Sequence, residues 1–240
     1  MDRLTAKKLI SKTRDDYNLI ADQFASTRKF NWGDFALALE SIPLQKGAKV
    51  LDMGCGNGRI FELLKNNDIE YYGLDISNDL IKHAQKNIPK GQFVVCDLLN
   101  TPYKDNEFDL VLCVATLHHI PSKEARERAV AEIYRITKPG GYTLATTWYF
   151  WKSQRHLKGI INTALAKAKG KTELDVGDFF MIWKNGNGDN IAKRYFHAWR
   201  KGEIIHAFKR AGFKSVHATF YLKDGQKIGN NLITIARKPK

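Results

Sequence analysis

A glycine-rich segment headed by an acid is the part of this sequence best suited to hold a small-molecule cofactor. Asp52 follows an apolar run, and three glycines, Gly54, Gly56 and Gly58, come after it at every second position. Glycine accepts positive φ and has no Cβ, so a ligand can lie directly against such a turn. Free N–H groups at the start of the helix expected after the turn would favour an anionic group there.

Two further acids are expected at the same edge of the fold. Asp75 ends the segment Glu70–Asp75, 23 residues after the first acid, and Asp97 follows the segment Gly91–Cys96. Ligands bind at the carboxyl ends of strands in open α/β sheets. A carboxylate at Asp75 can accept both hydroxyls of a ribose. One at Asp97 can accept from an adenine amino group, with Leu98 packing on the ring.

The glycine spacing narrows the class of cofactor. The dinucleotide fingerprint is G-x-G-x-x-G, whereas residues 54–58 have the pattern G-x-G-x-G. This departure points away from a pyrophosphate and toward a cofactor that combines a ribose with an amino-acid tail.

Adjacent histidines, His118 and His119, follow the predicted strand Phe108–Val114. No cysteine or acid is spaced to complete a metal site with them, so we expect no metal centre. Two alternatives remain for these histidines: one that hydrogen-bonds its own loop, and one that lies near the reacting group.

Alternating strands and helices are needed to position these residues. The apolar patterns predict strands that begin near residue 49 and span 70–75, 91–96, 108–114 and 142–148, with helices over 4–24, 33–41, 77–86 and 122–136. Such alternation forms parallel βαβ units. A helix over 203–211 and β-like segments over 214–221 and 231–236 fit an antiparallel hairpin at the end of the sheet.

Residues 149–190 differ from the rest. Basic residues are interleaved there with Trp151, Phe179, Phe180 and Trp183, and no strand alternation is visible. We expect a helical, partly mobile cover inserted after the fifth strand. The aromatic residues have two interpretations: they stack on single-stranded RNA bases, or they pack the cover onto the domain.

Positive charge is concentrated in the C-terminal part. The 240 residues have a net charge of +14, and residues 149–240 alone carry 19 Lys and Arg against 6 Asp and Glu. A surface of this kind is either simply solvated or faces a polyanion such as RNA.

Length, hydropathy and cysteine content set further limits. The length suits a single domain over 1–240, with N-terminal helices over 1–46, a cofactor-binding core over 47–148, a basic insertion or lid over 149–190, and a C-terminal helix and hairpin over 191–240. No apolar stretch is long enough for a membrane span, and the basic N-terminus lacks the apolar core of a secretory signal. Cys55, Cys96 and Cys113 lack metal-like spacing and suit reduced thiols in the cytoplasm.

From Tyr17 to Trp148 the sequence resembles the class I S-adenosylmethionine-dependent methyltransferases. The resemblance implies a Rossmann-like α/β fold: a mostly parallel seven-stranded sheet with an antiparallel last strand and helices on both faces. It also implies S-adenosyl-L-methionine as the cofactor.

Local signatures are similar to one subfamily, the tRNA methyltransferases that esterify 5-carboxymethyluridine at the wobble position. They lie in Tyr17–Trp32, Asp52–Gly58, Thr116–His119 and Arg194–Glu203. Members commonly have Tyr-Tyr-His where this chain has Tyr195-Phe196-His197. Animals carry a related domain fused to an AlkB-type dioxygenase. The resemblance implies the anticodon region of tRNA as partner and, in eukaryotes, a small zinc-binding activator subunit.

The resemblance also implies site residues. The expected cofactor-binding residues are Tyr17, Arg28, Trp32, Asp52, Gly54, Cys55, Gly56, Gly58, Asp75, Ile76, Asp97, Leu98, Val114 and Leu117. A carboxylate acceptor is already ionised at neutral pH, since its pKa is roughly 4, so no strong general base is expected. The expected catalytic residues are His118 near the reacting methyl, and Arg28, Arg194 and His197 to orient the acceptor. Alternative roles are the cofactor carboxylate for Arg28 and a phosphate contact for Arg194.

Two other functions share some of these features. A methyltransferase for a small quinone, carboxylic acid or sterol-like acceptor would keep every cofactor motif but would not bind RNA. A non-catalytic RNA-binding or subunit-stabilising pseudo-enzyme would lack some of the glycines or acids, all of which are present here.

Overall fold

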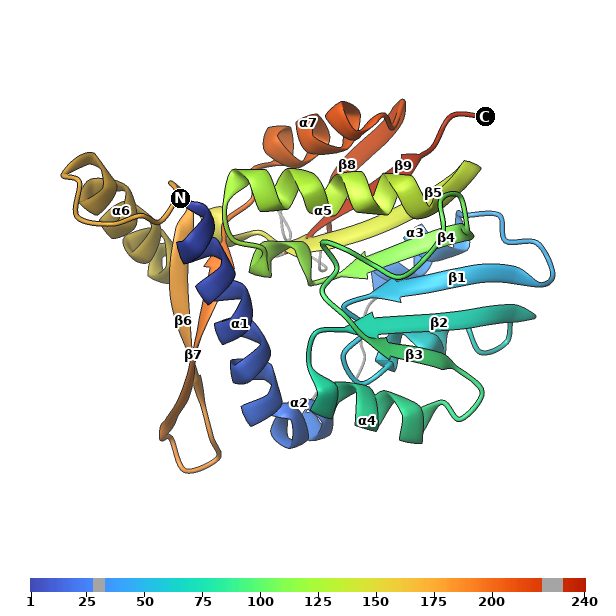
Figure 1. Cartoon of the computed structure of the whole chain (residues 1–240), viewed down its shortest axis with the longest axis horizontal. Coiled ribbons are helices and arrows are strands. Elements are labelled where there is room, and N and C mark those ends of the chain that lie inside the picture. Colours follow the sequence, from blue (N-terminus) through green and yellow to red (C-terminus); the bar gives the residue numbers. More distant parts are fainter. Residues whose placement is uncertain (28–32, 222–230) are drawn as a thin grey trace.

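A seven-stranded sheet forms the centre of the molecule (Figure 1). The computed structural model describes residues 1–27, 33–221 and 231–240. The strand order is β3-β2-β1-β4-β5-β9-β8, parallel from β3 to β5, with β9 antiparallel to both of its neighbours. The strands are β1 Ala48–Met53, β2 Ile69–Asp75, β3 Gln92–Val95, β4 Phe108–Val114, β5 Thr137–Trp148, β8 Ser215–Tyr221 and β9 Asn231–Arg237. The predicted α/β fold with an antiparallel last strand is therefore confirmed.

Alternation of side chains along the strands explains why helices cover both faces. In β1, Val50 packs into a cluster on one face, whereas Leu51 and Met53 pack into a second cluster on the other. The first cluster includes residues of α3 (Gly33–Glu40) and of the 3₁₀ helix η1 (Arg59–Leu63). The second includes α5 (Lys123–Ile136) and α7 (Lys201–Ala211), while α4 (Asn78–Asn87) packs along β2 and β3.

The local signals that predicted helix ends are confirmed. The Leu80 N–H donates to the Ser77 hydroxyl at the start of α4, and the Ala125 N–H donates to the Ser122 hydroxyl at the start of α5. Gly212 ends α7 with a φ of 114°.

The N-terminal segment forms two helices where the sequence predicts one over 4–24. Helix α1 spans Arg3–Leu19 and α2 spans Ala21–Thr27, with Ile20 between them at a φ of −101° and 2% exposed. Burial of Ile20 compensates for the break, because the side chain is removed from water at the bend. Helix α1 then crosses the carboxyl ends of the strands and contacts β7 (Figure 1).

The helix after the glycine turn is shorter than predicted. The sequence predicts an amphipathic helix there, but only the five-residue 3₁₀ helix η1 forms. Gly58, in the left-handed region with a φ of 77°, precedes it and lies against Ile88 at the end of α4.

Residues 149–197 contain a β-hairpin that the sequence analysis missed. After η2 (Leu117–His119) and β5, the chain forms η3 (Phe150–Lys152), α6 (Gln154–Ala168), β6 (Asp178–Lys184) and β7 (Asn190–His197). Strands β6 and β7 pair antiparallel as a separate two-stranded sheet. The expectation of a helical cover without strands is thus wrong for this part, and the aromatic runs flanking an Asn-Gly turn were the available signal.

The insertion has its own small core. Phe150, Ile160, Phe179 and Phe196 pack together, with Trp151 against them. Two of the four interleaved aromatic residues, Trp151 and Phe179, therefore help to hold the insertion together. Helix α6 projects from the sheet at one end of the molecule (Figure 1).

The remaining expectations concern the cysteines and membrane-spanning helices. All three cysteines are free thiols. No helix in the described part of the chain is both long enough and apolar enough to cross a membrane.

Candidate active site

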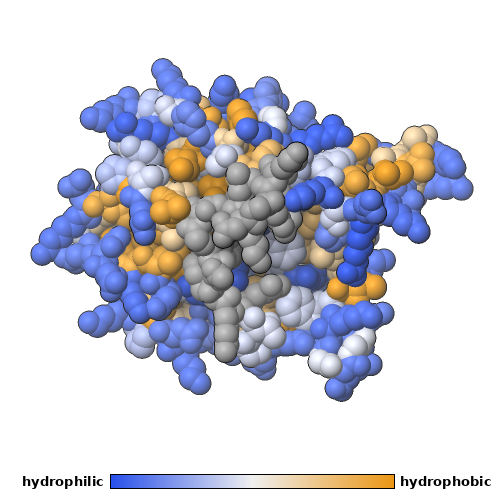
Figure 2. Space-filling model, turned by 180° about the vertical axis from the view of Figure 1, so that it is seen from behind, coloured by the Kyte–Doolittle hydropathy of each residue, from blue (hydrophilic) through white to orange (hydrophobic). Residues whose placement is uncertain are grey.

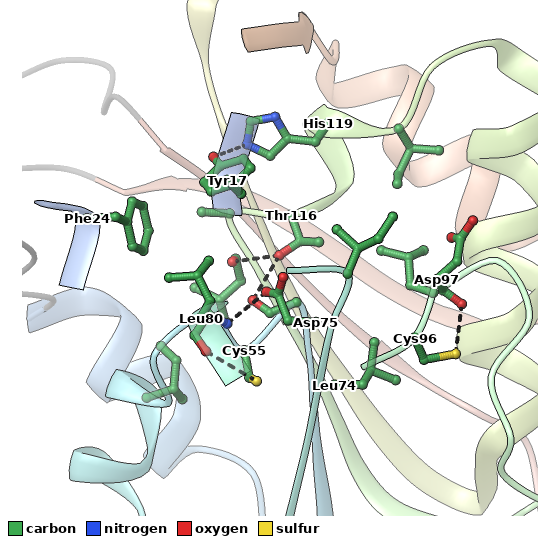
Figure 3. A pocket seen from close by; sticks show the side chains of 18 of the residues that line it. Tyr17, Phe24, Cys55, Leu74, Asp75, Leu80, Cys96, Asp97, Thr116 and His119 are labelled. Atoms are coloured by element: carbon green, nitrogen blue, oxygen red, sulfur yellow. Dashed lines mark hydrogen bonds between the residues drawn. The ribbon is translucent and has the colours of Figure 1, made fainter. Parts of the chain in front are cut away.

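A cleft lies at the carboxyl ends of β1, β2, β3 and β4, beneath α1 and α2 (Figure 3). It encloses about 930 Å³, part of which is open to solvent. The acids and glycines singled out from the sequence approach one another here because the strands are parallel and end at one edge.

The glycine turn brings bare backbone to the cleft. Gly54 has a φ of 77°, and a Cβ on it would lie 2.3 Å from the Thr116 hydroxyl. Gly56, with a φ of 56°, would place its Cβ near nothing but the Phe24 ring, at 3.6 Å. Side chains at either position would therefore strain the turn and narrow the cleft.

Four N–H groups of this turn donate within the protein and are not available to an anion. The Gly54 and Cys55 N–H groups donate to the Leu74 carbonyl, and the Gly56 N–H donates to Asp75. The Gly58 N–H donates to the Cys55 carbonyl. These bonds make the turn rigid.

Asp75 lines the cleft and has a fixed carboxylate. One oxygen accepts from the Ser77 N–H at 2.8 Å and the other accepts from the Gly56 N–H at 2.9 Å. Burial raises the pKa of Asp75, and the two backbone donors oppose this shift. Each oxygen keeps a second lone-pair direction, so the carboxylate can still accept from two hydroxyls of a ligand.

Asp52 lies beneath the cleft instead of lining it. It is fully buried, its Oδ2 accepts from the Tyr71 hydroxyl at 2.9 Å, and its Oδ1 has no partner among the described residues. Burial raises the pKa of Asp52 to about 7. Asp52 therefore does not contact a ligand in the cleft, and it can affect one only through its electrostatic field.

Most of the other residues predicted to bind the cofactor line the cleft. Cys55, Ile76, Asp97, Leu98 and Val114 all do so, and Asp97 accepts from the Leu99 N–H at 3.0 Å. Gly58 and Leu117 do not. Gly58 packs on α4, and Leu117 is fully buried, with its carbonyl accepting from Trp199.

Two of the predicted catalytic residues lie away from the cleft. His118 is fully buried and stacks on the Phe196 ring at 5.4 Å. His197 is 2% exposed, with Nδ1 2.7 Å from Asp178 and Nε2 3.0 Å from Glu203. Both are placed as structural residues. The predicted positions Arg28 and Trp32 lie outside the described residues.

Tyr17, His119 and Arg194 meet at the other end of the cleft. The Tyr17 hydroxyl is 2.8 Å from His119 Nε2, and Arg194 Nη1 donates to the same hydroxyl at 3.1 Å (Figure 3 shows the first pair). Burial, reinforced by the charge of Arg194, lowers the pKa of His119 to about 3. Arg194 is 4% exposed and has no ion pair with an acid among the described residues.

Sequence reasoning missed some cleft residues. Phe24, Thr116, His119 and Trp148 line the cleft but were not assigned a role in it. For His119 the signal was present, since adjacent histidines after a strand were noted, but their spacing does not show which of the two faces the ligand. In the described residues no cluster suited to a metal ion is found.

The comparisons with known proteins agree with this geometry. Residues 51–145 match the family model described as a methyltransferase domain. The chain is 41% identical over 133 residues to a tRNA (carboxymethyluridine(34)-5-O)-methyltransferase of Arabidopsis thaliana, covering 55% of this chain and 31% of that protein. A Schizosaccharomyces pombe enzyme with the same name is 29% identical over 214 residues, covering 82% of this chain and 86% of that protein.

A further relative and two solved structures extend the match. An Encephalitozoon cuniculi protein named as a methyltransferase is 31% identical over 198 residues, covering 82% of this chain and 85% of that protein. A Methanosarcina mazei S-adenosylmethionine-dependent methyltransferase matches with a TM-score of 0.68 at 20% identity, covering 84% and 97% of the two chains. A chain from a complex of the Haloferax volcanii Trm112 methyltransferase activator with a methyltransferase matches with a TM-score of 0.64 at 19% identity, covering 95% and 98%.

The strand order, the glycine turn and these matches define a class I S-adenosylmethionine-dependent methyltransferase, and S-adenosylmethionine is its cofactor. Within that class, the chain is similar to the tRNA (carboxymethyluridine(34)-5-O)-methyltransferases of Arabidopsis thaliana and Schizosaccharomyces pombe. It spans 31% of the length of the Arabidopsis relative, so it corresponds to one part of that longer protein.

The buried histidines predict how stability depends on pH. Burial first, and then neighbouring charges, lower the pKa of His118, so the unfolded state binds its proton more tightly. The contribution of a buried neutral histidine to the free energy of unfolding is complete above about pH 6.5. It is lost as pH falls below that value, by at most about 1.4 kcal/mol per pH unit for each residue. We expect His118→Phe to reduce the loss of stability between pH 7 and pH 5 in urea unfolding.

The exposed His206 supplies the control, because His206→Gln removes a histidine that is not buried. That variant should leave the pH dependence of the unfolding free energy unchanged. Equal slopes for wild type and His118→Phe would show that His118 is not held neutral by burial.

Proposed function

We propose that this protein transfers a methyl group to the carboxylate of a 5-carboxymethyluridine at the wobble position of tRNA. Similarity to these relatives supports the tRNA acceptor, since their names specify that reaction. The observation that carries the proposal is the buried Arg194, which lines the same cleft as Asp75 and is paired with no acid among the described residues. A buried guanidinium that no carboxylate neutralises suits an anionic acceptor.

The residues at the other end of the cleft fit the cofactor. In this proposal Asp75 accepts from the ribose hydroxyls, and Asp97 with Leu98 holds the adenine. Gly54 and Gly56 admit the amino-acid tail against bare backbone. Two further cleft residues, Ile76 and Val114, supply apolar contacts. The cofactor supplies an electrophilic methyl group when it is bound.

The chain's contribution to the reaction is positioning and charge. A carboxylate acceptor, with a pKa of roughly 4, needs no base to remove a proton at neutral pH. The structure offers none at this point, because His119 has a pKa of about 3 and already shares its Nε2 with Tyr17. Arg194 would orient the acceptor oxygen. Holding two reactants in line can supply about 7–11 kcal/mol of the barrier.

The insertion supplies the RNA-facing surface in this proposal. Helix α6 contains no acid, and its basic residues Arg155 and Lys158 are exposed, with no ion pair to another described residue. The projecting end of the molecule carries blue hydrophilic side chains beside orange apolar ones (Figure 2). Phosphates would bind there through charge alone.

His118 and His197 have structural roles in this proposal. His118 fills the aromatic cluster behind the cleft, and His197 joins β6 to α7 through Asp178 and Glu203. The proposal also includes a small activator subunit, as the family implies, and a cytoplasmic location, with which the free thiols agree.

A small acidic acceptor is the second candidate. The packing of Phe150 and Phe179 inside the insertion favours it, because these rings are not available to stack on bases. It would use the same Arg194 and the same cofactor site, but it would not need the basic surface of α6.

The acceptor is tested by incubating the protein with isotope-labelled cofactor and bulk tRNA, followed by nucleoside mass spectrometry. We expect label in a methyl ester of a modified uridine, sensitive to mild alkaline hydrolysis. The assay is run with and without an activator subunit from a related organism. If label appears only in small molecules, both with and without the activator subunit, the acceptor is a small acid and not tRNA.

The ribose assignment predicts a specific loss of cofactor affinity. Asp75→Asn keeps the size of the side chain but leaves one acceptor atom and a donor facing the Gly56 or Ser77 N–H. Loss of charge-assisted hydrogen bonds should weaken S-adenosylhomocysteine binding at least about tenfold in calorimetry. Unchanged affinity in a variant with an unchanged melting temperature would contradict the assignment.

The α6 surface predicts a change in salt dependence. Reversing two charges, as Arg155→Glu with Lys158→Glu, should weaken binding of an anticodon stem-loop and lower the slope of log K against log salt by about one for each lost phosphate contact. The control reverses Lys86 and Lys90, which are equally exposed and lie at the end of α4. Equal losses in both double variants would mean that α6 is not the RNA surface.

A further inference from the structure

Three side chains from distant parts of the sequence form one hydrogen-bonded chain at the acceptor end of the cleft. The Tyr195 carbonyl on β7 lies 3.0 Å from His119 Nδ1. His119 Nε2 lies 2.8 Å from the Tyr17 hydroxyl on α1, and Arg194 Nη1 on β7 lies 3.1 Å from the same hydroxyl. The chain therefore begins and ends on β7 and passes through η2 and α1.

The chemistry of the groups fixes the direction of every bond in this chain. A carbonyl can only accept, so His119 must donate to Tyr195 from Nδ1. A neutral imidazole carries one N–H, which leaves Nε2 as an acceptor for the Tyr17 O–H. The Tyr17 oxygen then accepts from Arg194. His119 remains neutral in this arrangement because burial and the nearby guanidinium lower its pKa to about 3.

Aromatic faces complete the surroundings of the guanidinium. Its central carbon lies 4.7 Å from the centroid of the Trp183 ring and 5.2 Å from that of Phe196. Its Nε has no partner among the described residues, although Arg194 is 4% exposed. The group is therefore desolvated and held in one plane, with donor capacity unused.

The nature of the orienting group decides what Arg194 can bind. Buried arginines are usually paired with a carboxylate, which orients the guanidinium but also cancels its charge. Here the orienting groups are a phenol and a neutral imidazole. The guanidinium is fixed in place and keeps its full positive charge, a combination that favours an anionic ligand over a neutral ligand of similar shape.

We propose that Tyr17 and His119 are positioning residues that hold Arg194 for a carboxylate acceptor without neutralising it, and so make the site selective for anionic over uncharged acceptors. This inference rests on the proposed function, because it concerns the same acceptor site. Tyr17 acts through its hydroxyl, while its ring lines the cleft.

The direct test compares RNA binding by wild type and Tyr17→Phe. Anticodon stem-loops carrying 5-carboxymethyluridine or its neutral amide are titrated by calorimetry with S-adenosylhomocysteine present. Wild type should prefer the carboxylate at least about tenfold, and Tyr17→Phe should lose most of that preference through weaker carboxylate binding. S-adenosylhomocysteine affinity should change less than about twofold, because the ring is retained.

Controls separate this role from a structural one. Tyr149→Phe removes a hydroxyl from a tyrosine that packs on Phe220 outside the cleft, and it should keep the wild-type preference. In turnover, Tyr17→Phe should raise the KM for the acceptor more than it lowers kcat. Equal loss of affinity for both RNAs, or parallel loss of cofactor binding, would overturn the positioning role.

A measurement without substrate keeps this inference separate from the proposed function. Nitrogen-15 spectra of the histidine rings, with His119→Gln to assign the signal, should show His119 as the neutral Nδ1–H tautomer still at pH 5. In Tyr17→Phe the Nε2 resonance should move. An Nε2–H tautomer in wild type would overturn the hydrogen-bond chain. If wild type shows the Nδ1–H tautomer but methylates no RNA, only the proposed function is contradicted.

Discussion

The parallel register of β2, β1 and β4 is the constraint on which the rest of the site depends. Pairing of Met53 with Leu74 brings the ends of β1 and β2 level, and the Leu74 carbonyl then accepts from the two N–H groups that open the glycine turn. Asp75, the next residue, is thereby fixed against Gly56. A slip of one residue would turn every alternate side chain to the opposite face and separate these groups. The site is thus a consequence of strand pairing, and its precision follows from the rigidity of the core.

Buried charged groups have different kinds of partner at the two ends of the cleft. At the cofactor end, Asp75 is stabilised by backbone donors, and Asp52 beneath it has a pKa raised to about 7 by burial. At the acceptor end, Arg194 is surrounded by aromatic rings and donates to one neutral partner, the Tyr17 hydroxyl. His197 lies apart from both ends and joins β6 to α7 through hydrogen bonds with Asp178 and Glu203, so it serves the fold. The buried charge of Asp75 is therefore compensated by backbone donors, whereas that of Arg194 is compensated by no carboxylate among the described residues.

The sequence predicts the features that local pattern determines. The glycine turn and the strand that ends at Asp75 lie close together in the sequence, and apolar runs and glycines are sufficient to predict them. The alternation of such strands with helices predicts the parallel sheet. The acceptor end could not be predicted in this way. Tyr17 and His119 are 102 residues apart, and Tyr17 and Arg194 are 177 apart, so their contact depends on how α1 crosses the strand ends. For the same reason the sequence places His118 at the reacting group, whereas in the structure His119 lines the cleft, because the spacing of adjacent histidines does not show which way each ring faces.

The central claim is that Arg194, held by neutral partners, receives the carboxylate of the acceptor beside the cofactor. The most direct measurement is a crystal structure of the protein with S-adenosylhomocysteine and an anticodon stem-loop containing 5-carboxymethyluridine. The account predicts a ribose hydroxyl on Asp75, and a carboxylate oxygen within hydrogen-bond distance of the Arg194 guanidinium. A carboxylate bound elsewhere, with Arg194 turned away from the cleft, would contradict it.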